Sequence, residues 1–146
     1  MFSFEGSIND HIAVVDVIDA QTITAGATGV LTGAIDMKDY RKIMCVISSG
    51  TLGTSGTLDA SVTGCATSGG SYVLITGKAI TQMVKATNDN DIAIIEVDEE
   101  AVAKQGYRYV KLHLVAGTAN GTHSAVVLGV PANFVVANNA DVVEVV

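Results

Sequence analysis

Three histidines, His11, His113 and His123, are the first candidates for acid–base or metal chemistry. Zinc sites need several His or Cys side chains at short, regular spacing, and none of the three has such a neighbour. His113 falls in an alternating stretch, which predicts an exposed position on a strand. A catalytic triad assembles only in space, but the Gly-x-Ser-x-Gly turn that presents a nucleophilic serine is absent. We therefore predict no catalytic residue, no metal site and no enzyme activity.

Two glycine-rich segments resemble nucleotide-binding loops only in part. Gly70–Lys78 ends in a Gly-Lys pair, but Tyr72 and Ala79 stand where a P-loop needs Gly and then Ser or Thr. The glycines of Gly50–Gly56 do not have the dinucleotide-binding spacing, and no predicted helix follows them. Both segments are predicted to be loops, and no cofactor is expected.

Acidic and amide side chains gather in two places. Asn88–Asp91 brings oxygen ligands together, but Ala93 replaces the glycine of a calcium loop and strands flank the segment. We predict a solvated turn there, with a weak cation site as the alternative. Glu96 and Asp98–Glu100 form the densest acidic group. A glycosidase pair needs an aromatic cleft, and four Tyr, three Phe and no Trp make a solvated acidic face the better interpretation.

The chain contains two cysteines, Cys45 and Cys65. Cys45 lies inside the apolar run Ile43–Ile47, where a cysteine usually serves as a small buried hydrophobic residue. Two cysteines in a chain of this length are too few for a disulfide framework. A single bridge between them remains the alternative.

Composition limits the classes of function. The formal net charge is −7, and the eight basic residues are scattered, so we expect no nucleic-acid partner. No apolar stretch approaches the roughly 18 residues of a membrane span, and Met1–Glu5 has no secretory signal. We therefore expect no membrane partner, and a soluble protein made in a cytoplasm. Charged residues are only 16%, which suggests that neighbouring subunits cover part of the surface.

Short β-type runs separated by Gly, Asn, Asp, Ser and Thr dominate the chain. Tyr40–Ser48 is apolar on both faces, as expected for a central strand between two packed layers. Asp98–Gln105 is the one helical candidate, and Asn120-Gly121 predicts a tight turn. The pattern predicts an all-β, single-domain β-sandwich, jelly-roll-like, with at most one short helix; a barrel is the alternative. We expect an N-terminal arm over 1–11, the domain over 12–131 and a C-terminal tail over 132–146.

Several short motifs within residues 14–131 carry a resemblance to a known family. They are Asp19-Ala20-Gln21, Gly33-Ala34-Ile35-Asp36, the strand Ile43–Ile47, Gly56-Thr57-Leu58, Gly106–Leu112 and Ala125–Gly129. In their order the chain resembles the small β-sandwich capsid decoration, or cement, proteins and related virion proteins of tailed phages. Val62–Cys65 departs from relatives that often carry acidic and Ser residues there, so no shared contact is implied at that place.

The resemblance implies a structural role on the capsid surface of a virion. The partners would be the major capsid protein and further copies of the chain, with a homotrimer favoured. Burial of surface across capsomer boundaries would stabilise the shell. We expect the termini to supply contacts, the tail by adding a strand to a neighbour's sheet edge. The candidate contact residues are Phe2, Phe4, Val142, Val143, Val145 and Val146.

Two other functions are compatible with the same pattern. A receptor- or carbohydrate-binding module of a fibre or tail would use Tyr rings for stacking, with Tyr72, Tyr107 and Tyr109 as candidates. Tyr107 and Tyr109 are expected to share one face of a strand. A head–tail completion or tail protein is a further structural option.

Overall fold

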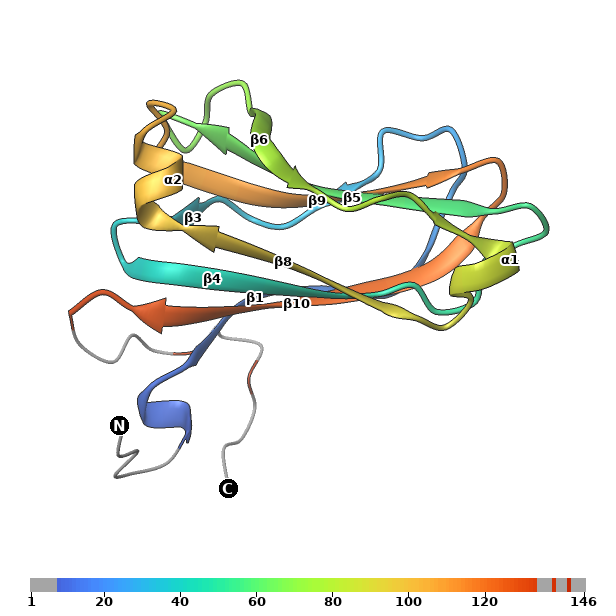
Figure 1. Cartoon of the computed structure of the whole chain (residues 1–146), viewed down its shortest axis with the longest axis horizontal. Coiled ribbons are helices and arrows are strands. Elements are labelled where there is room, and N and C mark those ends of the chain that lie inside the picture. The colour runs from blue at the N-terminus through green and yellow to red at the C-terminus, as the bar shows by residue number, and fades with distance from the viewer. Residues whose placement is uncertain (1–7, 134–137, 139–141, 143–146) are drawn as a thin grey trace.

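In the part of the chain that the structure describes, ten strands form two antiparallel sheets that lie face to face (Figure 1). The structure is a computed structural model that describes residues 8–133, 138 and 142. In the first sheet the strand order is β1-β10-β4-β8, with β1 at Ala13–Ile23, β10 at Gly121–Pro131, β4 at Tyr40–Ser48 and β8 at Ile92–Asp98. A short 3-10 helix, η1 (Ile8–Asp10), precedes β1.

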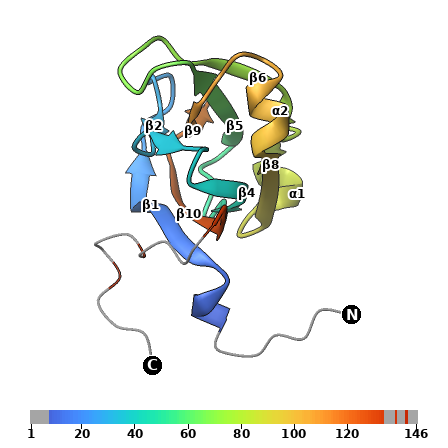
Figure 2. The ribbon, with the colours of Figure 1, turned by 90° about the vertical axis from the view of Figure 1, so that its left-hand side faces the viewer.

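The second sheet has the central order β2-β9-β5-β6. Its strands are β2 (Val30–Leu31), β9 (Tyr109–Gly117), β5 (Thr57–Cys65) and β6 (Val73–Ala79), with β3 (Ile35–Asp36) beside β9 and β7 (Met83–Val84) beside β5. Viewed along the strands, the two sheets form separate layers (Figure 2). The layers do not close into a ring, so the sandwich prediction is confirmed over the barrel.

The topology is that of a jelly roll. Both β2 and β3 pair with β9, and both β6 and β7 pair with β5, so the ten strands occupy eight strand positions. Consecutive positions alternate between the sheets except at β5, which is followed by β6 and β7 in the same sheet, and this is the pattern of a jelly roll with two Greek keys. This confirms the predicted fold class, because alternating apolar residues along each strand require a second layer to cover one face.

One face of every long strand is buried between the sheets. On β4 the inward residues are Ile43, Cys45 and Ile47, and on β9 they include Leu112 and Leu114. Each such aliphatic side chain contributes about 1.5–3 kcal/mol when it is removed from water. Both cysteines are buried and free, so the alternative of a disulfide is not realised, and Cys45 is the small buried hydrophobic residue that its neighbours predicted.

We expect the thiol of Cys45 not to react in the folded protein. Burial raises its pKa to about 12, which leaves almost no thiolate at pH 8. In a Cys65→Ser variant, a thiol-reactive chromophore should therefore label nothing until denaturant is added. Labelling of the folded variant at the rate seen for the unfolded chain would contradict the buried position.

Two short α-helices flank β8 in the sequence. The expected helix is α2 (Glu99–Ala103), and Gly106 follows it at a φ of +79°. Asp98 occupies the N-cap position without a side-chain cap, because its carboxylate pairs with Lys42 at 3.3 Å. The other helix is α1 (Lys85–Asn88), whereas at most one short helix was predicted. It forms where the Asn88 side chain accepts the backbone N–H of Val84, a contact that propensity alone does not show.

Candidate functional site

The histidines do not form a common site. On β9, His113 lies half-buried on the outer side of the second sheet, because its Nε2 contacts the carbonyl of Thr28 at 2.6 Å. His123 on β10 is 1% exposed, and its Nδ1 is bonded to the carbonyl of Ser49. Among residues 8–133, 138 and 142 there is no group of three His, Cys, Asp or Glu side chains that could hold a metal ion.

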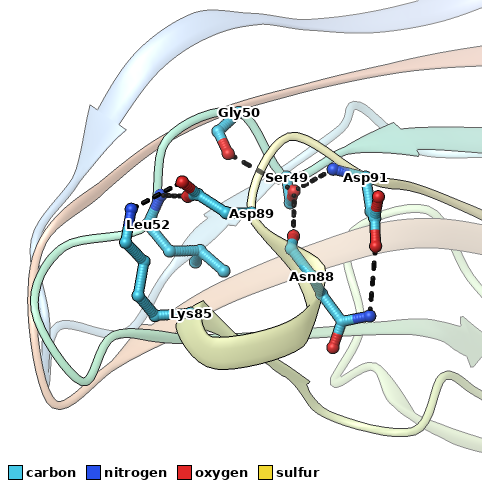
Figure 3. A network of polar contacts seen from close by, with 7 residues as sticks. All are labelled: Ser49, Gly50, Leu52, Lys85, Asn88, Asp89 and Asp91. Atoms are coloured by element: carbon cyan, nitrogen blue, oxygen red, sulfur yellow. Dashed lines mark hydrogen bonds and ion pairs between the residues drawn. The ribbon is translucent and has the colours of Figure 1, made fainter.

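The polar turn Asn88–Asp91 is hydrogen-bonded to the loop that follows β4 (Figure 3). Asp89 accepts the backbone N–H of Leu52 at 2.8 Å and pairs with Lys85 at 2.5 Å. Lys85 lowers the pKa of Asp89, and the bond from Leu52 acts in the same direction. Ser49 donates to the Asn88 carbonyl at 2.8 Å and accepts from the Asp91 N–H at 2.9 Å. Of the side-chain oxygens predicted to face solvent or a weakly bound cation, those of Asp89 thus hold the loop after β4 near α1, while Asp91 is exposed.

The acidic group around α2 faces water and nearby lysines. Glu100 pairs with Lys104 at 2.7 Å, which lowers the pKa of Glu100 and raises that of Lys104. Lys78 on β6 donates to the backbone carbonyl of Glu96 at 2.7 Å. This contact covers part of the free edge of β8, and a lysine at a strand edge disfavours pairing with another strand.

The three tyrosines proposed for stacking on sugars have other contacts. Tyr107 lies before β9, and its ring packs inward against Gly64 and the core, so the expectation that it shares a face with Tyr109 is wrong. Tyr109 lies outward beneath the Arg108 guanidinium, 5.1 Å from the ring centroid. The Lys111 ammonium lies 4.4 Å from the centroid of the Tyr72 ring. Cation–π contacts therefore occupy one face of each outward ring.

The outer face of the first sheet is apolar. Residues directly opposite one another on paired strands project to the same side. One row crosses all four strands through Val17, Val126, Val46 and Ile94. We name it the central row. Neighbouring rows add further apolar side chains, and together they form what we call the apolar face: Val14, Val17, Met44, Val46, Ile92, Ile94, Val126, Leu128 and Val130.

Several side chains of the apolar face are exposed to a degree that is unusual for their type. Ile92 is 65% exposed, Ile94 is 56% exposed and Val126 is 37% exposed. A pocket of about 160 Å³ opens at one end of the face. Met44 and Leu128 are among the residues that line it, and Lys42 and Glu96 are its charged lining residues. Contiguous exposed apolar patches rimmed by polar groups mark contact sites for other proteins.

The outer face of the second sheet is polar along its two central strands, apart from Val115 on β9. Its β5 row consists of Thr57, Asp59, Ser61 and Thr63, and its β9 row includes Lys111 and His113. The two sheets bury similar aliphatic residues between them, and the second sheet also exposes Leu31 on β2 and Val73 and Leu74 on β6, away from its two central strands. What distinguishes the first sheet is that its outward aliphatic side chains form an unbroken row across four paired strands.

The predicted contact residues in the termini cannot be compared with this face. Phe2, Phe4, Val143, Val145 and Val146 lie outside the described residues, and Val142 is half-buried. The apolar face was missed, although its signal is present in Tyr40–Ser48, which is apolar on both sides. The expectation that this strand lies between two layers is wrong, because within the described part of the chain only one layer covers it.

The fold defines the chain as a single-domain jelly-roll β-sandwich protein with an apolar outer face. No protein-family model and no curated protein sequence matches it. It is similar in structure to YomS, a protein derived from the SPBc2 prophage, with 15% identity and a TM-score of 0.37 over 76% of this chain and 94% of that one. It is also similar to the disulfide-linked pili of Bacillus endospore appendages, with 15% identity and a TM-score of 0.36 over 88% of this chain and 98% of that one.

These two similarities are too distant to carry a functional argument. The proposals below therefore depend on this chain's own residues and on the family resemblance of its motifs. Within the described residues, no helix has both the length and the apolar character needed to span a membrane.

Proposed function

We propose that this chain is a structural protein of a phage particle, specifically a capsid decoration protein that stabilises the shell by bridging capsomers. The observation that carries the proposal is the apolar face, whose row of aliphatic side chains crosses all four strands of the first sheet, whereas the outward row of β5 in the second sheet is polar. The order of the short motifs in residues 14–131, which resembles decoration proteins, supports the same role. The proposed partners are the major capsid protein and other copies of the chain.

The mechanism needs contact area and no reaction. Removal of apolar surface from water contributes about 25 cal/mol per Å² before the costs of association. In a particle with many symmetric copies, a modest contribution at each contact is multiplied. The net charge of −7 suits the outside of a shell better than its DNA-filled interior. We accordingly propose a location on the capsid surface and no enzyme activity.

The described ends of the chain lie on the same side of the molecule as the apolar face. The helix η1 precedes β1, and Asn138 accepts the N–H of Val14 on β1 at 2.7 Å (Figure 1). Asn138 also donates to Asn9 at 2.6 Å. In the proposed arrangement, the apolar face contacts a neighbouring protein subunit, and the described chain ends lie beside that contact.

A role in glycan binding has less support. Stacking on a sugar needs a free aromatic face, and one face of both Tyr72 and Tyr109 is covered by a cation. A head–tail completion or tail protein would use the same kind of contact surface. Its place in the particle would differ, so imaging distinguishes it from a decoration protein.

Particles that lack this chain should lose heat stability. We expect shells assembled without it to release DNA at a lower temperature than complete particles, and the purified chain added back to restore the difference. The measurement is dye-detected DNA release on heating, combined with electron microscopy of particles that carry the labelled chain. Label at the tail would place the chain in the tail, and absence of the chain from purified particles would refute the virion role.

A further inference from the structure

We infer that the apolar face binds a second copy of this chain, so that two sandwiches pack through their first sheets about a two-fold axis. The inference names the partner that the apolar face binds. The place of such a dimer in a particle rests on the proposed function. The physical basis of the inference is the composition of the face, since its side chains are apolar like those on the inward, buried side of the same sheet. The outward Met44 and Val46 alternate along β4 with the buried Cys45 and Ile47.

The size of the face suits a small dimer interface. Four strands about 4.8 Å apart span about 19 Å, and seven residues of about 3.3 Å each span about 23 Å. The register between β4 and β8 covers this length, from Lys42 to Ser48. The flat area is therefore about 440 Å² per copy, and the side-chain surface exceeds it. Two copies together bury a flat area of about 880 Å², which is below the roughly 1,200 Å² of standard interfaces and is the size of a weak, reversible association.

The distribution of charge favours this face over the rest of the surface. A chain with a net charge of −7 repels its own copy wherever acidic groups meet. The central row contains no charged side chain. Lys42, Glu96 and Asp98 lie toward one end, where Lys42 and Asp98 already form a pair. A two-fold axis along the central row places the end that carries Lys42, Glu96 and Asp98 opposite the Ser48 end of the other copy. No charged side chain then faces the same residue of the other copy.

Face-to-face packing is also favoured over pairing of sheet edges. Lys78 holds the Glu96 carbonyl on the free edge of β8, and a second strand would have to displace it. Sheets that pack through their faces lie about 10 Å apart, the spacing that the two sheets of one copy already use. Branched side chains from the two central rows would then interdigitate.

The test is the mass of the purified chain in solution, in the absence of any phage particle. Sedimentation velocity over a concentration series to about 100 µM should show a monomer–dimer equilibrium. Val126→Lys places a charge in the central row and should weaken dimerisation at least about 30-fold. Val73→Lys is the matched control, since Val73 is a 54% exposed valine on β6 of the second sheet, and it should leave the dimer unchanged.

Unfolding of the Val126→Lys variant would be detected by circular dichroism and by its thermal midpoint. In that case Ile94→Lys, at a more exposed site of the same row, replaces it. A wild-type chain that stays monomeric, a trimer, or a dimer that both Val126→Lys and Ile94→Lys leave intact would overturn the inference. Because no particle is present, a dimer that never enters virions would refute the proposed function alone, and a monomer found in virions would refute the dimer alone.

Discussion

Replacement of Gly50 by alanine should destabilise the protein by at least about 3 kcal/mol. Gly50 follows β4 at a φ of +53°, a region that costs an L-residue about 1–2 kcal/mol. The added Cβ would also lie 2.0 Å from the carbonyl oxygen of Thr122. Neither segment can easily move away. The Gly50 carbonyl accepts the N–H of Asn90 at 2.8 Å, and the Thr122 N–H donates to Thr51 at 3.1 Å.

Two other glycines separate the causes of this effect. Gly26 has a φ of +73° and open space around its Cβ position, so Gly26→Ala should cost only the backbone strain of about 1–2 kcal/mol. Gly69 has open space and no positive φ, so Gly69→Ala should change stability by less than about 0.5 kcal/mol. Urea unfolding of the three variants measures the series. Equal losses in all three would show that the approach of Gly50 to Thr122 is wrong.

Stability should fall as the pH drops below 6.5, and His123 should account for a defined part of the loss. Burial lowers the pKa of His123 from 6.5, and the bond to the Ser49 carbonyl opposes this only in part. Because Nδ1 donates to that carbonyl, an added proton must enter at Nε2. This atom is buried and has no hydrogen-bond partner in the described part of the chain.

The sign follows from the two protonation states. Below pH 6.5 the unfolded chain binds a proton at His123, whereas His123 in the folded chain stays neutral until the pH reaches its lower pKa. A lower pH therefore favours unfolding. The stability is fully present above 6.5 and decreases toward the lower folded-state pKa, with a limiting slope of about 1.4 kcal/mol per pH unit for one proton. Below the folded-state pKa both states are protonated, and this contribution to the slope ends.

A His123→Gln variant measures this contribution. Gln retains an N–H donor for the Ser49 carbonyl and has no proton to gain, so its unfolding free energy should depend less on pH as the pH falls below 6.5. The difference in slope between wild type and variant, from urea unfolding at each pH, removes the effect of the carboxyl groups common to both. Parallel pH profiles would mean that His123 is not held neutral in the core.

The strands were predictable where local pattern and turn chemistry agree. Thr57–Cys65 alternates inward Leu58, Ala60 and Val62 with outward polar residues, and β5 follows this pattern. Asn120-Gly121 predicted a tight turn, and the chain does reverse between β9 and β10, but the reversal lies at Thr118–Asn120 and Gly121 is already the first residue of β10. In these segments each residue's neighbours along the chain already specify which side it faces, because the side-chain period of a strand is two.

The candidate site was not predictable in the same way. The two-sided apolar character of β4 indicated burial of both faces, but a pattern does not say whether the second cover comes from the same chain or from another. The linking role of Asn88–Asp91 was equally hidden, since Ser49 and Leu52 meet that turn only after β4 and α1 are in place. The separation of Tyr107 from Tyr109 depends on the strand starting at Tyr109.

By itself the sequence determined that this protein is an all-β sandwich with a buried Cys45 and with no clustered basic residues, because alternation, turn residues and charge are properties of neighbouring positions. Only the tertiary structure decided that Val17, Val46, Ile94 and Val126 stand in one row on an outer surface. These four residues come from four strands separated by long stretches of chain, and the pairing register that aligns them depends on the whole sheet.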